Sequence, residues 1–225
     1  EEFELVKNRY GRVPVFGPEI IREECHESGK GTAFFNFMTR KIGINVPFVE
    51  RLSQDGKRDK VKIIRGLYSH EFGHFCLLPY TLSLALFLSY KAQKVFGRFA
   101  ETIYANFSDF EDNQLVLDKD LMREELKETL AETFETMPRP SPVFSAIYSV
   151  YNERYNLGLN IDISSFNNDI QTKINDAITQ LGQMTIKSPQ DYVDKREHIV
   201  YQLQYSQMQC FSNAIMPLLE FELKE

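Results

Sequence analysis

The sequence predicts a mainly α-helical protein of the α+β class, with a small β-sheet near the N-terminus and a helical C-terminal region. Three observations lead to this prediction. Apolar residues recur at helical spacing through most of the chain after residue 60. Short runs rich in Phe, Ile and Val, with the alternation of a half-buried strand, lie before residue 50. Proline and glycine interrupt the helical patterns at several points, which indicates a series of separate helices.

The composition is that of an ordinary soluble protein and argues against two classes of function. The chain has 225 residues, of which 43% are apolar and 26% charged, so it can bury a sizeable core. A formal net charge of −6, without a cluster of Lys or Arg, argues against a nucleic-acid partner. The most apolar segment, 77–90, has 14 residues. A membrane-spanning helix needs roughly 20, so we expect a core helix there and no transmembrane segment.

The cysteines predict a reducing compartment. Cys25, Cys76 and Cys210 are odd in number, widely separated and without Cys-x-x-Cys spacing, which is typical of reduced thiols. The N-terminal segment also lacks the basic and apolar regions of a signal peptide, and it does not begin with Met. We therefore expect a cytoplasmic protein and a sequence that is a trimmed or partial chain.

The sheet is expected within the first fifty residues. Residues 1–30 mix charges with proline and glycine, and they predict an irregular or short-stranded segment. Residues 33–38 and 41–46 predict two short strands that form a hairpin. In the second of them, Ile42, Ile44 and Val46 alternate with polar or small residues, as the residues of a half-buried strand do.

A polar turn, 53–60, precedes the helix that carries the strongest chemical signal, 60–75. This helix contains the sequence His-Glu-Phe-Gly-His, in which the histidines are His70 and His74. Two histidines four residues apart lie about one turn apart on the same helix face, so both imidazoles can reach a single metal ion. Zinc suits such a site, because imidazole is a preferred ligand and a three-ligand site leaves an open position for water.

Glu71 is the expected general base. It projects about 100° round the helix from His70, so it can accept a proton from a water at the metal without displacing a ligand. The alternative is that the histidines are partly buried helix residues paired with carboxylates. Two features argue against this alternative. The histidines continue an apolar face that begins at Ile63, and Gly73 removes a side chain beside the expected metal.

Helices are expected on both sides of a proline-rich linker. Before it, the patterns predict helices 79–97, 98–117 and 121–136, with Pro79 at the start of the first and Asp118 or Asp120 as the cap of the last. The linker, 137–142, has three prolines in five residues. It divides the chain into a first domain, 1–137, and a helical C-terminal region, 138–225, which is expected to pack on the first.

Three helix starts are expected after the linker. Ser141, Ser165 and Ser188 each precede a helical pattern, and the first and third are followed directly by proline. The predicted helices cover 142–157, 166–181 and 189–222.

A third protein ligand is expected from the acidic part of the helix 98–117, because two histidines and a water do not complete a zinc site. Asp109, Asp112 and Asn113 share a face of this helix. Glu111 points almost opposite Asp109. Asn113 can hydrogen-bond a ligating carboxylate or its histidine partner. Asp109 is therefore the preferred third ligand, and Asp112 and Glu111 are the alternatives.

The histidine motif with a downstream acidic helix resembles the gluzincin clan of zinc metallopeptidases. More narrowly, His-Glu-Phe-Gly-His-Phe with Pro-Tyr at 79–80, Phe-Ser-Asp at 107–109 and Asn113 is similar to a group of predicted metallopeptidases, often neighbours of von Willebrand A proteins or AAA ATPases. The similarity covers roughly 39–121. It implies a zincin-like helical domain, His70 and His74 as zinc ligands, and Glu71 as general base and acid. An Asp as third ligand departs from the usual gluzincin pattern, which has Glu.

The expected function is a zinc-dependent peptidase that hydrolyses peptide bonds in a peptide or protein substrate. The alternative is a metal-containing binding or scaffold module that acts with an ATPase or von Willebrand A partner. Glu71 favours the enzyme, because a purely structural site needs no base. In zinc peptidases a strand such as 41–46 borders the cleft, and its free edge can bind an extended peptide. The other interpretation is that this strand only covers the motif helix.

Overall fold

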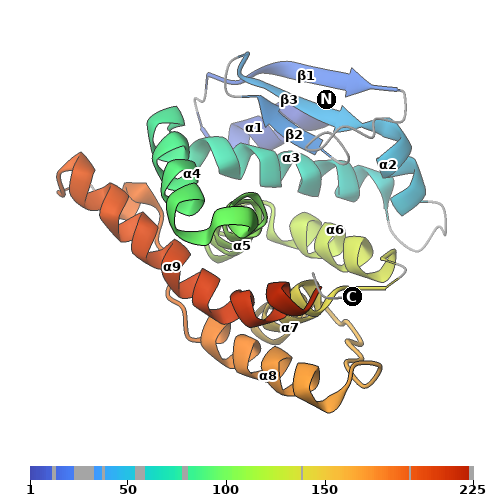
Figure 1. The fold of residues 1–225 in the computed structure, drawn as a ribbon. Helices are drawn as coiled ribbons and strands as arrows, with labels where there is room; N and C mark the ends of the chain where they lie inside the picture. Colours follow the sequence, from blue (N-terminus) through green and yellow to red (C-terminus); the bar gives the residue numbers. More distant parts are fainter. Residues whose placement is uncertain are drawn as a thin grey trace. The chain divides into compact units, whose positions relative to one another are not determined.

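The computed structural model of the protein describes residues 1–11, 14–22, 33–36, 39–53, 59–77, 81–137, 139–192 and 194–222. Within these ranges the protein is mainly helical, with a small sheet near the N-terminus and a helical C-terminal region (Figure 1). This confirms the predicted fold class.

The chain divides into two compact units. The first unit consists of Glu1–Leu82 and Asp112–Thr136, and the second of Ser83–Glu111 and Met137–Glu225. The division after Thr136 falls at the predicted linker. Residues 83–111, which the sequence analysis assigns to the first domain, group instead with the C-terminal region.

Three short strands form the sheet of the first unit. They are β1 (Phe16–Ile21), β2 (Ala33–Asn36) and β3 (Lys41–Asn45), in the spatial order β1-β3-β2. β2 and β3 pair antiparallel, which confirms the predicted hairpin, and β1 pairs parallel with β3. Ile42 and Ile44 are buried, as their alternation predicts.

Two short helices of the first unit were not predicted. α1 (Glu2–Arg9) lies in the segment expected to be irregular, and it buries only Phe3 and Val6, too few residues to give a recognisable period. α2 (Val46–Leu52) follows β3 directly. The side chain of Asn45 accepts a hydrogen bond from the N–H of Phe48 at 3.3 Å and so caps the helix. The strand therefore ends one residue earlier than predicted.

α3 (Lys60–Cys76) is the central helix of the first unit, and it agrees with the predicted motif helix to within a residue. The side chain of Asp59 caps it by accepting from the N–H of Val61 at 2.8 Å. The sheet and α1 lie on one side of α3, and α6 (Arg123–Glu135) lies on the other (Figure 1). The expected turn before α3 lies mostly outside the described residues.

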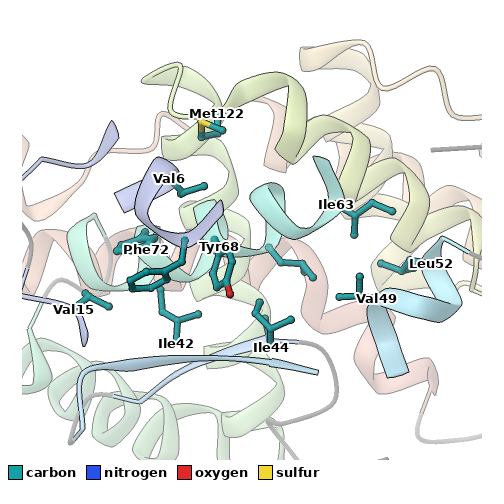
Figure 2. Packing of buried hydrophobic residues seen from close by; sticks show 13 residues of the cluster. Val6, Val15, Ile42, Ile44, Val49, Leu52, Ile63, Tyr68, Phe72 and Met122 are labelled. Atoms are coloured by element: carbon teal, nitrogen blue, oxygen red, sulfur yellow. The ribbon is translucent and has the colours of Figure 1, made fainter. Parts of the chain in front are cut away.

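The core of the first unit fills the space between α3, α1, α2 and the sheet (Figure 2). Phe72 and Tyr68 of α3 extend toward Ile42 and Ile44 of β3. Val49 and Leu52 of α2, Val6 of α1, Val15, Ile63 and Met122 complete the labelled part of this cluster. The core therefore holds α3 on the side of Phe72, which leaves its other sides for the helices that follow.

α5 (Ala100–Asp118) carries the acidic segment and ends in a tight turn. Asp120 and Met122 in this turn have φ of 58° and 57°, in the left-handed region. α6 then begins with Met122 at its N-cap and without a side-chain cap. The prediction that Asp118 or Asp120 caps this helix is therefore wrong, because the left-handed residues direct the chain into α6 without an aspartate at the capping position.

Helices also make up the second unit. They are α4 (Leu82–Phe96, whose first residue belongs to the first unit), a 3₁₀ turn (Gly97–Phe99), the first part of α5, α7 (Pro142–Tyr155), α8 (Asn168–Gly182), a 3₁₀ helix (Pro189–Tyr192) and α9 (Glu197–Glu222). Pro79, the expected start of α4, lies outside the described residues. No helix in the described ranges has the length and hydropathy needed to cross a membrane.

The helix starts after the linker agree only in part with the prediction. Ser141 caps α7, since its hydroxyl accepts from the N–H of Phe144 at 3.4 Å. Asn167 rather than Ser165 caps α8. The segment after Ser188 forms the short 3₁₀ helix, and α9 begins only at Glu197.

Candidate metal centre

α3 brings its two histidines together at one point. His70 and His74 lie one turn apart, with their rings edge to face and ring centroids 4.6 Å apart. The Nε2 atom of His74 lies 3.2 Å from the Nε2 atom of His70. Both residues are half-buried, and the side chain of His70 is 19% exposed. The two ring nitrogens thus converge between two side chains that are each only partly buried.

α5 supplies a carboxylate beside the two histidines. One possible ligand atom from each of His70, His74 and Asp112 lies within 4.8 Å of the other two. Asp112 is completely buried, and its Oδ2 lies 3.3 Å from Nδ1 of His70. An ionised carboxylate is costly to bury unless a positive charge lies beside it. A metal ion, or a protonated His70, provides that charge.

Asn113 determines which nitrogen of His70 is available to a metal. Its Oδ1 lies 2.9 Å from Nδ1 of His70, a shorter contact than the one that Asp112 makes with the same nitrogen. An amide oxygen only accepts hydrogen bonds, so Nδ1 of His70 carries the hydrogen. In the neutral ring the lone pair is then on Nε2, which faces His74.

The spacing of the nitrogens fits a tetrahedral zinc ion. Two nitrogens that each lie about 2.0–2.1 Å from zinc, at a tetrahedral angle, are about 3.3 Å apart. The two Nε2 atoms are 3.2 Å apart. Two imidazoles and one carboxylate are ligands that zinc accepts, and three protein ligands leave a fourth position open. Among the described residues, these three could therefore hold a metal ion and leave one coordination position for water.

Gly73 provides the space for the carboxylate of Asp112. A Cβ atom at Gly73 would lie 2.1 Å from Oδ1 and 2.6 Å from Oδ2 of Asp112. Any side chain at this position would displace the carboxylate. The sequence predicts that Gly73 removes a side chain beside the metal, and in the structure the carboxylate occupies that space.

Asp109, the preferred third ligand, is not in this group, and the structure brings Asp112 there instead. Asp109 is exposed, and its charge adds to burial in raising the pKa of Tyr104 to about 12. The two aspartates share a face of α5, but three residues of helix rise about 4.5 Å. A shared face does not show at which level α5 meets α3, and the structure brings Asp112, one of the alternatives, beside the histidines.

Glu111, the other alternative, is also outside the group. Its side chain is completely buried, and its carboxyl oxygens make no hydrogen bond with the residues that the structure describes. Burial raises the pKa of Glu111 well above its usual value. Burial thus favours the neutral form of this carboxyl group, and a neutral carboxyl is a poor metal ligand.

Glu71 is buried on α3, with 3% of its surface exposed, and it does not belong to the group of three ligands. Its role as general base stays a prediction.

Two residues beside the centre were missed by the sequence analysis. The hydroxyl of Tyr10 donates to the backbone carbonyl of Ser69 at 2.6 Å. Burial and the charge of Asp112 raise the pKa of Tyr10, which places its hydroxyl near that carboxylate. Tyr10 and Ser69 are 59 positions apart, and Tyr10 lies in a segment without a period, so no local signal identifies the pair.

Comparison with protein-family models, with curated proteins and with solved structures finds no match. The function must therefore be argued from the residues and their geometry.

Proposed function

We propose that this protein is a zinc-dependent peptidase, with His70, His74 and Asp112 as metal ligands and Glu71 as the general base. The convergence of two imidazoles from α3 and a buried carboxylate from α5 carries this proposal. Zinc bound by such residues lowers the pKa of a water to about 7 and polarises a substrate carbonyl. The substrate class is a peptide or protein.

Three residues besides the histidines have distinct roles in this proposal. Glu71 accepts a proton from the attacking water and delivers it to the leaving amine. Asn113 holds the Nδ1 hydrogen of His70, so that Nε2 is directed toward His74. Asp112 supplies a negative charge that is buried away from competing water.

A metal-containing scaffold module, acting with an ATPase or von Willebrand A partner, is the second candidate. The burial of Glu71 favours it, because a base with 3% of its surface exposed needs a way to reach water. A site with three ligands among the described residues favours the enzyme, because such a site leaves a fourth position for water. We also infer a cytoplasmic location, since neither Cys76 nor Cys210 forms a disulfide with the residues that the structure describes.

Metal analysis combined with peptide hydrolysis tests the proposal. The parent and the Glu71→Gln variant should each hold one zinc per chain. The variant should hydrolyse peptides about 10²- to 10⁴-fold more slowly than the parent, which is the usual contribution of a general base. Glu132→Gln is the matched control, because Glu132 is equally buried but lies on α6, and its activity should be that of the parent.

Two further variants separate the candidate ligands. Asp112→Ala should lose zinc, whereas Asp109→Ala should keep it, because only Asp112 lies with the histidines. A parent protein that neither contains nor takes up zinc would reject the metal centre. If the parent and the Glu71→Gln variant both hold zinc and neither cleaves a peptide, the scaffold function is favoured.

A further inference from the structure

The candidate metal centre depends on the relative position of two segments of the first unit. His70 and His74 come from α3, and Asp112 comes from the part of α5 that belongs to the same unit. A metal site functions only when its ligands are held within about 0.5 Å of the required geometry by their supporting contacts. The contacts that align α3 with the end of α5 therefore matter as much as the ligands.

Ser69, the residue directly before His70, makes such a contact. Its hydroxyl donates to the backbone carbonyl of Leu121 at 2.8 Å. Ser69 is completely buried, so water cannot replace this hydrogen bond. Leu121 lies in the turn that ends α5, and its own N–H donates to the carbonyl of Val116 at 3.0 Å. The carbonyl that Ser69 binds is thus fixed to the last turn of the helix that carries Asp112.

Tyr10 holds Ser69 from the end of α1. The Ser69 hydroxyl donates its proton to Leu121, and the Tyr10 hydroxyl donates its single proton to the backbone carbonyl of Ser69. The Tyr10 hydroxyl lies 2.6 Å from the carbonyl oxygen and 2.9 Å from the hydroxyl oxygen of Ser69. Its ring stacks on Phe72, with centroids 5.4 Å apart and planes at 24°. Tyr10 therefore connects the N-terminal helix to the turn of α3 that carries His70.

We propose that Ser69 and Tyr10 are positioning residues for the metal centre, which fix the rotation of α3 relative to the end of α5. This inference rests on the proposed zinc ligands. A rotation of α3 by about 20° would move an atom about 5 Å from the helix axis by about 2 Å, enough to separate His70 from Asp112. Because Ser69 and His70 are adjacent on α3, a hydrogen bond that fixes the position of Ser69 also fixes that of His70.

Zinc affinity of single variants, measured by competition with a chelator, tests the proposal. Ser69→Ala should weaken zinc binding by about 10- to 100-fold, the usual effect of losing a contact that orients a metal ligand. Tyr10→Phe keeps the stacked ring and removes one hydrogen bond, so it should weaken zinc binding by about three- to tenfold. The visible absorption of the cobalt-substituted protein, which reports ligand geometry, should change in Ser69→Ala.

Thr129→Val is the matched control. The hydroxyl of Thr129 likewise contacts a backbone carbonyl of α3, that of Ile63 at 3.3 Å, and shares its proton with the carbonyl of Glu125 in α6 at 2.9 Å. Thr129 is also buried. The contact with Ile63 lies two turns before His70. Thr129→Val should therefore lower thermal stability about as much as Ser69→Ala, while its zinc affinity and cobalt spectrum should be those of the parent.

Three other outcomes would reject the positioning role, and one of them would also reject the metal centre. A parent that binds zinc and a Ser69→Ala variant that binds it equally tightly would overturn the positioning role and leave the metal centre intact. Equal losses of zinc affinity in Ser69→Ala and Thr129→Val would show a general loss of packing, and would also overturn it. A parent that takes up neither zinc nor cobalt would reject the metal centre, and the positioning role with it.

Discussion

Space for the candidate metal centre is made at a single residue of α3. The carboxylate of Asp112 occupies the position that a Cβ atom of Gly73 would take. Gly73→Ala should therefore displace Asp112 and remove one of three ligands, because a methyl group cannot lie 2.1 Å from a carboxylate oxygen. We expect the variant to fold with reduced stability and to be purified without zinc. Metal analysis and a chelator titration measure this.

Gly182→Ala is the control for this substitution. Gly182 is also helical, at the end of α8, and no atom lies within 4 Å of its Cβ position. Alanine there should be neutral or stabilise the protein by up to about 1 kcal/mol, because alanine has the higher helix propensity. Full zinc occupancy in Gly73→Ala would contradict the position of Asp112 in this site.

At the scale of elements, α3 approaches α6 closely at a second glycine. A Cβ atom at Gly66 would lie 2.1 Å from Oγ1 of Thr129 and 2.5 Å from the backbone oxygen of Glu125, both on α6. Gly66→Ala should push the two helices apart and lower the free energy of unfolding by about 1–3 kcal/mol, the usual cost of overpacking. Urea unfolding of the parent, Gly66→Ala and Gly182→Ala measures the difference.

The expected loss of stability comes from the backbone oxygen of Glu125, which cannot move away from the added methyl group. A side chain such as Thr129 can change rotamer, but the carbonyl of Glu125 is fixed within α6. If Gly66→Ala unfolds at the same urea concentration as the parent, α3 and α6 do not pack as closely as the structure shows.

For the whole molecule, Glu111 links stability to pH. Burial raises its pKa above the usual 4.5, so the folded protein keeps a proton that the unfolded chain releases. The stability that this proton contributes is fully present below about pH 4.5 and is lost as the pH rises toward the folded pKa. Glu111→Gln removes the titration and keeps the size of the side chain.

The variant and the parent should therefore differ most at high pH. We expect Glu111→Gln to be more stable than the parent at pH 8, with a difference that shrinks toward pH 4, when unfolding free energies are compared across this range. The other titrating groups are the same in both proteins, so their effects cancel. A difference independent of pH would show that Glu111 has the same pKa in the folded and the unfolded protein.

The sequence by itself determined the fold class, the β2–β3 hairpin, the bounds of α3 and the start of α7. These features follow from interactions over a few residues: the alternation of Ile42 and Ile44, the helical period that leads to the histidines, and the cap at Ser141. The four-residue spacing of His70 and His74 is local too, so their meeting on one helix face follows from the helix alone.

The short helices α1 and α2 were decided by packing, because seven or eight residues with two buried side chains each show no clear period. Tertiary structure also selected Asp112 over Asp109. Both lie on one face of α5, and the level at which that helix meets α3 depends on Gly73 and on contacts such as Ser69 with Leu121, which join residues 52 positions apart. A local sequence pattern predicts the direction in which a side chain points. It does not predict the position along their axes at which two helices contact each other, because the packing of the whole core determines that position.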